Sequence, residues 1–391
     1  MRIASVKCLL LSAPYGTPGE SEREVHLKGG YRSATLIKVE TDEGYFGVGE
    51  TYAGVYAPTA VRELVRQFET YLIGLDPLNI PAAFDRLRLA SHYWGRMGFT
   101  QSTIGGIEMA LWDLKGNVLG RPVHQLLGGP MHEELPVYAS GGSLKPLADL
   151  ETELKGYLAA GYQTIKVRIG KLPADGILEW VAFCRKVLGS DVALAVDAIQ
   201  GLSKYPWTIK QAVDICAKIE PMEISWVEEP TEVTNYRGFA EIRRRTNIPV
   251  AGGESVSSFV EAQSYLDADA LDLFQIDATV IGGLGMFRRV AQLCERQFLP
   301  VAVHAWCSGV GIMGNYHAAF ASRNCSILEM PTVPNPLRDE LLVEPWQLRN
   351  GKLPLPTAPG LGVVIKEDLE ERYPFRPDAV YLVPETSRLM A

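Results

Sequence analysis

Residues 192–198 read VALAVDA and residues 224–229 read ISWVEE, and each apolar run ends in a carboxylate. Short apolar runs of this kind, with turn residues on either side, are typical of buried strands. The pattern recurs along the chain, with about 23 to 31 residues between successive ionisable residues, which is the length of one strand and one helix. The ionisable residues at these strand ends are Lys166, Asp197, Glu228, Glu254, Asp277, His304 and Glu329.

Eight candidate strands follow residue 133, and helical stretches separate most of them. This alternation implies right-handed crossovers and a parallel sheet, and eight such strands can close a barrel. Charges at one end of buried strands are costly unless they are paired, so we interpret that end as a functional rim. The candidate strands are LPVYAS (135–140), TIKVRI (164–169), VALAVDA (192–198), ISWVEE (224–229), PVAGGE (249–254), LDLFQID (271–277), LPVAVH (299–304) and SILEM (326–330).

The N-terminal block has a different pattern. Residues 1–55 contain three strand-like runs with a hairpin signal at Asp42-Glu43-Gly44, and residues 58–127 are helical in pattern. The tail beyond about residue 345 is rich in Pro and Gly, and we expect it to pack back against this block. We therefore predict an α+β capping domain over residues 1–130, a barrel domain over 131–345 and a C-terminal segment over 346–391 that completes the cap.

The composition is that of an ordinary soluble globular protein, with 47% hydrophobic and 21% charged residues among 391. A net charge of −8 without a Lys/Arg cluster argues against a nucleic-acid partner. Six scattered cysteines favour reduced thiols and a cytoplasmic location. The opening MRIASVKCLLLSAPYG is interpreted as a first strand rather than a signal peptide, and no stretch approaches the length of a membrane span.

Three carboxylates end neighbouring strands of the predicted barrel, at Asp197, Glu228 and Glu254. Carboxylates held that close must share a cation or take up protons. Oxygen ligands without Cys or His favour a hard ion, so we predict one Mg²⁺, with Mn²⁺ as an alternative. Glu229 is a candidate supporting residue, and salt-bridged rim carboxylates without a metal remain the other interpretation.

The other ionisable strand ends supply candidate catalytic groups. Asp277 on the adjacent strand can bind one imidazole nitrogen of His304 and leave the other to move a proton, although a core histidine is an alternative. Lys166 and Arg168 lie two residues apart and share a face, where they either contact substrate or cover the carboxylates. Glu329 is a candidate hydrogen-bond partner for a substrate or enolate oxygen, or else a surface residue.

Loops of the capping domain, at about residues 15–32 and 52–58, are expected to lie over the barrel mouth. Their polar and aromatic side chains suit a small hydroxylated anion as substrate, with solvated loop residues as the alternative for each. The candidate substrate contacts are Arg23, His26, Lys28, Tyr31, Arg32 and Tyr56, with Trp94 and Arg96 further along the chain.

These motifs together resemble the enolase superfamily, in its mandelate racemase-like subgroup. The resemblance covers nearly the whole chain through IGGIEMALWDLKGNVLGRPVHQLLGG, IKVRIG, AVDA, WVEEP, AGGES, FQIDATVIGG and AVHAW. It implies a capping domain over a (β/α)₇β modified TIM barrel, and Mg²⁺ ligands at Asp197, Glu228 and Glu254. It also implies a His304–Asp277 acid–base pair, with Lys166 assisting and Glu329 supporting the enolate, and removal of a proton α to a carboxylate. A homo-oligomer is implied by the resemblance alone.

Two positions depart from the family pattern. Relatives often carry a second Lys as a base where this chain has Arg168, and Asn where it has Ile199. Racemisation needs a proton acceptor on each face of the α-carbon, and Arg is a poor one. We therefore expect a one-base reaction through His304, most simply dehydration of an aldonic or aldaric acid to a 2-keto-3-deoxy acid. The alternatives are a racemase or epimerase, a lactone cycloisomerase, and a non-catalytic binding protein on the same fold.

Overall fold

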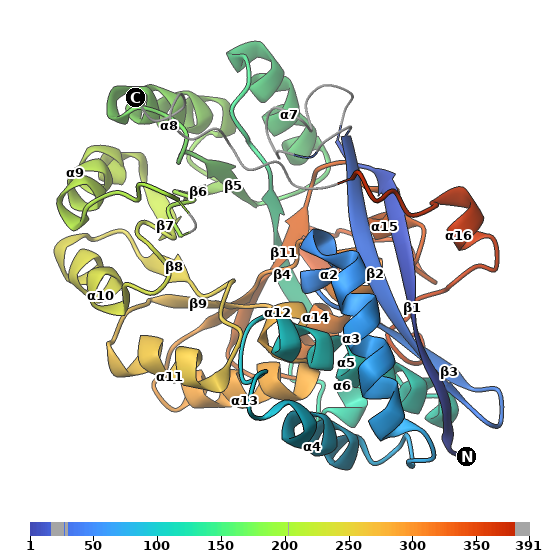
Figure 1. The fold of residues 1–391 in the computed structure, drawn as a ribbon. Coiled ribbons are helices and arrows are strands. Elements are labelled where there is room, and N and C mark those ends of the chain that lie inside the picture. Colours follow the sequence, from blue (N-terminus) through green and yellow to red (C-terminus); the bar gives the residue numbers. More distant parts are fainter. Residues whose placement is uncertain (17–26, 28–29, 202, 380–391) are drawn as a thin grey trace.

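The computed structural model describes residues 1–16, 27, 30–201 and 203–379, and it places them in a barrel with a smaller domain at one side (Figure 1). Eight parallel strands follow one another around the barrel in chain order. Pairing of the last strand with the first, for example of Glu329 with Tyr138, closes the sheet. The predicted barrel with an α+β cap is therefore confirmed.

The barrel strands are shorter than the apolar runs suggest. The strand after Pro249 ends at Gly252, because Gly253 adopts a φ of 111° that breaks the ladder. His304 likewise lies one residue beyond its strand. The strands are β4 (Glu134–Ser140), β5 (Thr164–Arg168), β6 (Ala193–Asp197), β7 (Ile224–Glu228), β8 (Val250–Gly252), β9 (Leu273–Ile276), β10 (Val301–Val303) and β11 (Cys325–Pro331).

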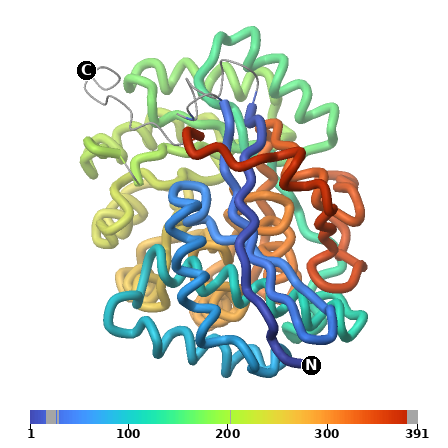
Figure 2. Tube along the Cα trace, turned by 45° about the vertical axis from the view of Figure 1, so that its right-hand side comes forward, coloured from blue at the N-terminus to red at the C-terminus, as the bar shows by residue number. Residues whose placement is uncertain are grey.

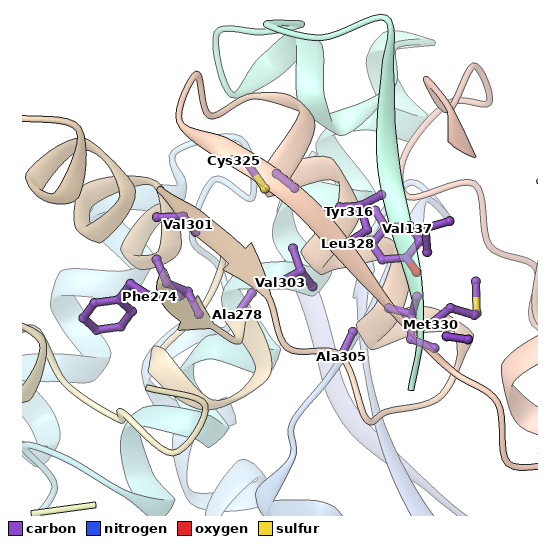
Figure 3. Close-up of a cluster of buried hydrophobic side chains, with 14 of the residues drawn as sticks. Val137, Phe274, Ala278, Val301, Val303, Ala305, Tyr316, Cys325, Leu328 and Met330 are labelled. Carbon is purple, nitrogen blue, oxygen red and sulfur yellow. The ribbon is translucent and has the colours of Figure 1, made fainter. Parts of the chain in front are cut away.

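Helices surround the strands and bury the outward half of each pleat. Figure 3 shows this contact at β10 and β11, where Val303 and Leu328 lie beside Tyr316 of a barrel helix. The barrel helices are α7 (Leu147–Ala159), α8 (Ala174–Leu188), α9 (Ile209–Ile219), α10 (Tyr236–Arg245), α11 (Phe259–Asp267), α12 (Ala278–Ile281), α13 (Leu284–Glu295), α14 (Gly309–Phe320) and α15 (Pro336–Asp339), with a short 3₁₀ turn at Glu220–Met222. None of the described helices is long and apolar enough to cross a membrane.

The capping domain is a three-stranded antiparallel sheet backed by helices. Its hairpin turns where predicted, with Gly44 at a φ of 84°. The helix α5 is buried on several sides because it packs between this sheet and the barrel helices. The elements are β1 (Ile3–Pro14), β2 (Tyr31–Thr41), β3 (Phe46–Glu50), α2 (Ala53–Tyr56), α3 (Pro58–Leu72), α4 (Ile80–Ser91), α5 (Phe99–Leu119) and α6 (Val123–Leu126).

The cap approaches the barrel closely at α5. A Cβ added to Gly105 would lie 2.4 Å from the backbone nitrogen of Gly283, which precedes α13. Only glycine allows the two backbones to meet at this distance. The cap is therefore docked on the α12–α14 side of the barrel, where these helices follow the strands that lead to Asp277 and His304 (Figure 1).

The tail contacts both parts of the chain. Its strand β12 (Lys352–Pro354) pairs antiparallel with the first residues of β4, Glu134 to Pro136. Further on, Leu361 donates a backbone hydrogen bond to Asp113 of α5, and the stretch after α16 (Leu369–Arg372) pairs with β1 through Pro374. Figure 2 shows this segment crossing the N-terminal strands. The boundaries at residues 130 and 345 remain predictions.

Candidate active site

The alternation of side chains along the barrel strands turns the predicted residues toward one region at the carboxyl ends of the strands, which we call the cup. Side chains two residues apart on a strand point the same way, so Asp197, Glu228 and His304 each lie one step above an inward-facing filler. Trp226 underlies Glu228, and Ala302 underlies His304. The fillers form one buried layer across the barrel, made by Tyr138, Ala195, Trp226, Ala251, Leu273 and Ala302.

Lys166 forms the centre of one half of the cup. Its Nζ lies 2.5 Å from Glu228 Oε1, 3.1 Å from Glu329 Oε1 and 4.0 Å from Asp197 Oδ2. Burial opposes the charged ammonium, but these carboxylates outweigh it and raise the pKa of Lys166 well above its usual value. Lys166 therefore stays protonated, and its contacts favour the role of charge partner over that of base.

Arg168 lies beside Lys166 and is fixed by two further contacts. Its guanidinium donates to the carbonyl oxygen of Gly141 at 3.0 Å and stacks on the Trp306 ring, 4.5 Å from the centroid. Its Nε is 4.0 Å from Asp197 Oδ2. Because guanidinium does not lose its proton in proteins, Arg168 supplies a fixed positive charge here and no base.

Glu329 is buried in the cup rather than exposed at the surface. It accepts hydrogen bonds from the backbone of Ala305 at 2.8 Å and from Trp306 Nε1 at 3.2 Å. Burial would raise its pKa, but Lys166 and His304 lower it to about 2. Glu329 is thus a fixed carboxylate between the Lys166 and His304 sides of the cup.

The other half of the cup is the predicted histidine–carboxylate pair. His304 Nδ1 lies 2.8 Å from Asp277 Oδ2, and His304 Nε2 faces Glu254 Oε2 at 3.6 Å. Asp277 is the N-cap residue of α12 rather than the last residue of a strand, and its Oδ1 accepts from the backbone nitrogen and the hydroxyl of Thr279. One carboxylate oxygen thus binds α12 while the other orients the imidazole, which is the arrangement that a proton-transferring histidine needs.

The carboxylates around His304 determine its charge. Burial disfavours the imidazolium, but Glu254, Glu329 and Asp277 together raise the pKa of His304 to about 10. The ring therefore holds a proton strongly as long as no other cation offsets those carboxylates.

The three predicted metal ligands line the same cup, at the ends of β6 and β7 and just after β8. Burial and mutual repulsion raise the pKa of Asp197 to about 6 and that of Glu254 to about 7. Glu229 beside them has a pKa raised well above its usual value by burial and by Glu254, and its Oε1 has no hydrogen-bond partner among the described residues. The four carboxyl groups outnumber the two neighbouring cations, Lys166 and Arg168, and their oxygen atoms suit a hard divalent ion.

As they stand, the described residues include no three Asp, Glu, His or Cys side chains that converge closely enough to hold an ion. Glu228 is engaged elsewhere, since its Oε1 binds Lys166 and its Oε2 accepts from Trp226 and Gln275. Binding would therefore require the carboxylates to turn toward a shared point. The chemistry and charge of the residues fit a magnesium ion, and the roles of Asp197, Glu228 and Glu254 as ligands remain predictions.

Two of the six described non-glycine residues with left-handed backbone lie beside these carboxylates. Ile199 and Glu229 adopt left-handed φ values of 50° and 44°, which are unusual for side chains of their size. Such residues cost on the order of 1–3 kcal/mol each and gather at functional sites. The backbone nitrogen of Ile199 donates to Asp197 Oδ1 at 2.8 Å, so the strained turn orients that carboxylate even without the Asn side chain of relatives.

The structure describes only some of the residues that were predicted to contact the substrate. Arg23, His26 and Lys28 lie outside the described residues. Tyr56 packs edge-on against Tyr52, whose ring in turn meets His304 edge-on at 5.9 Å. Tyr31 instead lies under the guanidinium of Arg376, and Trp94 stacks on Phe68 within the cap. Tyr56 therefore lies beside the Tyr52 ring that contacts His304. A substrate role for these aromatic residues remains a prediction.

Several residues that shape the cup were not among those predicted from the sequence. Gln275 lies two residues before Asp277, so the pleat alone could have placed it inside the barrel. Trp306 follows His304 in the quoted AVHAW motif, but nothing in the sequence shows that its ring covers Arg168. Asn315 of α14 donates to Asp277 Oδ1 at 2.8 Å, and no sequence signal marked it.

Two family models match this chain. Residues 29–128 match the N-terminal domain of the mandelate racemase/muconate lactonizing enzymes, and residues 149–369 match the enolase C-terminal domain-like family. These matches cover most of the capping domain and most of the barrel, though not β1 or β4, and they include every catalytic and metal-binding residue predicted above.

Relatives match along almost their whole length. A D-galactarolactone cycloisomerase of Agrobacterium fabrum is 30% identical over 94% of this chain and 97% of its own, and an arabinonate dehydratase of Saccharolobus solfataricus is 29% identical over 86% and 89%. The crystal structure of an L-talarate/galactarate dehydratase from Salmonella typhimurium, liganded with Mg and L-lyxarohydroxamate, superposes with a TM-score of 0.83 at 26% identity over 95% and 92% of the two chains. The chain therefore belongs to the enolase superfamily, in the mandelate racemase/muconate lactonizing enzyme family.

Proposed function

We propose that this enzyme removes the proton α to the carboxylate of a sugar acid and then expels the β-hydroxyl, which gives a 2-keto-3-deoxy acid and water. The observation that carries this proposal is the difference between the two halves of the cup. His304 presents Nε2 toward the cup while Asp277 holds Nδ1, whereas Lys166 and Arg168 opposite are both kept as cations. Proton transfer from one face suits elimination better than inversion, which needs two acceptors.

His304 carries out the proton transfers in this scheme. Its Nε2 accepts the α-proton, and the electrons of the broken C–H bond move into the carboxylate to give an enediolate. The same nitrogen then returns the proton to the β-hydroxyl as the C–O bond breaks, and the enol product tautomerises to the keto acid. Asp277 holds the ring in one orientation throughout and stabilises its charged form.

Charged residues around the cup prepare it for an anionic substrate. Lys166 and Arg168 supply positive charge beside the three acidic side chains, and Glu329 is fixed between the two halves. A divalent cation bound by Asp197, Glu228 and Glu254 would neutralise the charge that develops on the substrate carboxylate, and it would offset the Glu254 charge that keeps His304 protonated.

The direct test is a screen of aldonic and aldaric acids with the purified protein and Mg²⁺, read out as keto-acid formation and as exchange of the α-hydrogen in D₂O. Keto acid with loss of one water supports the proposal. Inversion at the α-carbon without keto acid would replace it with racemisation, and no exchange with any acid would favour a binding protein.

A second candidate function is cycloisomerisation of a sugar lactone, because a cycloisomerase is among the relatives that match along the whole chain. The same α-proton removal would then expel an internal ring oxygen instead of hydroxide. Incubation with galactarolactones separates the two reactions: a ring-opened keto acid without loss of water indicates cycloisomerisation.

Metal dependence is tested separately by calorimetric titration of the chelator-treated protein with Mg²⁺ and with Mn²⁺. One bound ion per chain is expected, and Asp197→Asn should weaken binding by about 10-fold or more because it removes one anionic ligand. Equal affinity in Asp197→Asn and the unaltered protein would contradict the proposed ligand set. The homo-oligomer and the absence of a nucleic-acid partner also remain predictions.

A further inference from the structure

Glu50 is a buried carboxylate of the capping domain that no step of the proposed reaction uses. It ends β3 and is 1% exposed. Its oxygens accept hydrogen bonds from the backbone nitrogen of Ser308 at 3.0 Å, from the Ser308 hydroxyl at 2.5 Å and from the backbone nitrogen of Gly311 at 2.9 Å. The cap thus supplies hydrogen-bond acceptors to the N-terminus of the barrel helix α14, four residues after His304.

The two residues after Glu50 reach the other element that carries the acid–base pair. The Tyr52 backbone nitrogen donates to the carbonyl oxygen of Thr279 in α12 at 3.2 Å. The hydroxyl of Thr51 lies 2.7 Å from that of Ser102, which donates to the same carbonyl at 2.6 Å. The cap therefore holds α12 through one carbonyl and α14 through its first turn.

Those two helices hold Asp277 between them. Asn315, on α14, donates from Nδ2 to Asp277 Oδ1 at 2.8 Å and accepts from the backbone nitrogen of Ala278 at 2.7 Å. Thr279, on α12, donates its hydroxyl to the same oxygen at 2.6 Å. Asp277 Oδ1 is thereby fixed by groups that the cap touches, and Oδ2 is left for His304.

We propose that Glu50, Thr51 and Tyr52 of the capping domain position the His304–Asp277 pair through the N-terminus of α14 and the Thr279 carbonyl. Within the proposed function, on which this inference rests, these are positioning residues that do not touch the substrate. In this role the tripeptide Glu50–Thr51–Tyr52 orients the proton-transferring imidazole.

The chain offers a matched control in Glu108. This buried carboxylate of α5 also accepts backbone hydrogen bonds from the start of a barrel helix, from Leu284 at 2.8 Å and Gly285 at 3.0 Å. It caps α13, however, and within the described part of the chain no side chain of α13 hydrogen-bonds to Asp277 or His304. Glu108→Gln therefore disturbs the docking of the cap in the same way without reaching the pair.

The experiment compares Glu50→Gln with Glu108→Gln on the full chain. In Glu50→Gln an amide NH₂ faces the donors of Ser308 and Gly311, which need an acceptor, so α14 should shift. The kcat for α-proton removal should then fall about tenfold or more, because small misplacements of reacting groups slow a reaction by this much. KM should stay within about threefold, because the substrate contacts are unchanged. Glu108→Gln should keep kcat within about threefold while losing similar thermal stability.

Ser102→Ala serves as a milder variant in case Glu50→Gln folds poorly. It removes one hydroxyl that binds Thr279, and kcat should fall by more than it does in Glu108→Gln, with KM unchanged. Equal losses of kcat in Glu50→Gln and Glu108→Gln, or a change confined to KM in Glu50→Gln, would overturn the proposal.

A readout that needs no substrate separates this inference from the proposed function. Nitrogen-15 labelling of histidine reports the Nδ1–H proton shared with Asp277 as a downfield resonance. Glu50→Gln should shift or broaden the His304 signal, and Glu108→Gln should leave it in place. An unchanged His304 signal in Glu50→Gln contradicts the positioning role, whether or not any sugar acid is turned over.

Discussion

Two buried histidines in this enzyme show opposite electrostatics. His304, at the barrel mouth, faces Asp277, Glu254 and Glu329, and its pKa is raised to about 10 although burial opposes the charge. His317, eight residues into α14, stacks on His124 of α6 with ring centroids 5.4 Å apart. Burial, followed by the neighbouring imidazole, lowers the pKa of His317 to about 3.

The difference shows that burial by itself favours the neutral imidazole. Surrounding carboxylates favour the protonated imidazole, which can then take part in proton transfer. His317 accepts a hydrogen bond at Nδ1 from the backbone of His124 at 3.1 Å, which joins the cap to α14. His304 instead presents one nitrogen to the cup. The same residue type thus serves as a neutral link between domains in one place and as the proposed acid–base group in the other.

Replacing each histidine in turn tests the comparison most strongly. His304→Asn should lower the rate of α-hydrogen exchange by about 10³-fold or more, because general acid–base groups contribute factors of this size. His317→Gln should keep exchange within about threefold. The exchange rates of both variants are measured in D₂O by NMR. Comparable losses in the two variants would contradict the assignment of His304, rather than His317, as the acid–base group.

Asp277→Asn sharpens the comparison by removing a carboxylate from His304 while keeping the ring. The amide can no longer hold Nδ1–H in place, so exchange should fall about 10²-fold or more, as expected when a histidine loses the carboxylate that fixes its tautomer. Unfolding by urea serves as the control, because Thr279 and Asn315 also depend on this side chain. Normal exchange in a stable Asp277→Asn variant would exclude the pair as the proton carrier.

His317 predicts a pH dependence of stability. The unfolded chain takes up a proton at this residue below about pH 6.5, whereas the folded protein does so only near pH 3, so stability is lost as the pH falls through this window. The loss is about 1.4 kcal/mol per pH unit, or roughly 2 kcal/mol between pH 6.5 and 5. Urea unfolding at several pH values should show a flatter profile for His317→Gln, and identical profiles would refute the assignment.

Arg168→Lys tests the half of the cup opposite His304 and has the smallest expected effect. Lysine keeps the charge but loses the planar contact with Trp306 and the hydrogen bond to Gly141, so kcat/KM should fall about tenfold. Steady-state kinetics on the best acid of the screen give the value. No change at all would show that the charge suffices and that the stacked geometry contributes nothing.

The sequence determined much of this site because the direction of a side chain on a strand follows from its position among neighbouring residues. Apolar runs that end in Asp197, Glu228 and His304 predicted both the barrel and the rim that carries these side chains, since side chains in a strand alternate with a period of two. The pairing of His304 with Asp277 followed from the order of neighbouring strands. The strained turns at Ile199 and Glu229 could not be predicted, because their side chains do not favour left-handed backbone.

The tertiary structure alone decided what surrounds the acid–base pair. Glu50 and Ser308 are 258 residues apart in the chain, and Trp306 and Ser140 are 166 apart, yet each pair is within hydrogen-bonding distance. Nothing near Glu50 in the sequence indicates that its carboxylate caps a barrel helix. Such contacts depend on how one domain docks against another, and docking is fixed by the packing of whole surfaces, such as the close approach at Gly105, rather than by any local pattern.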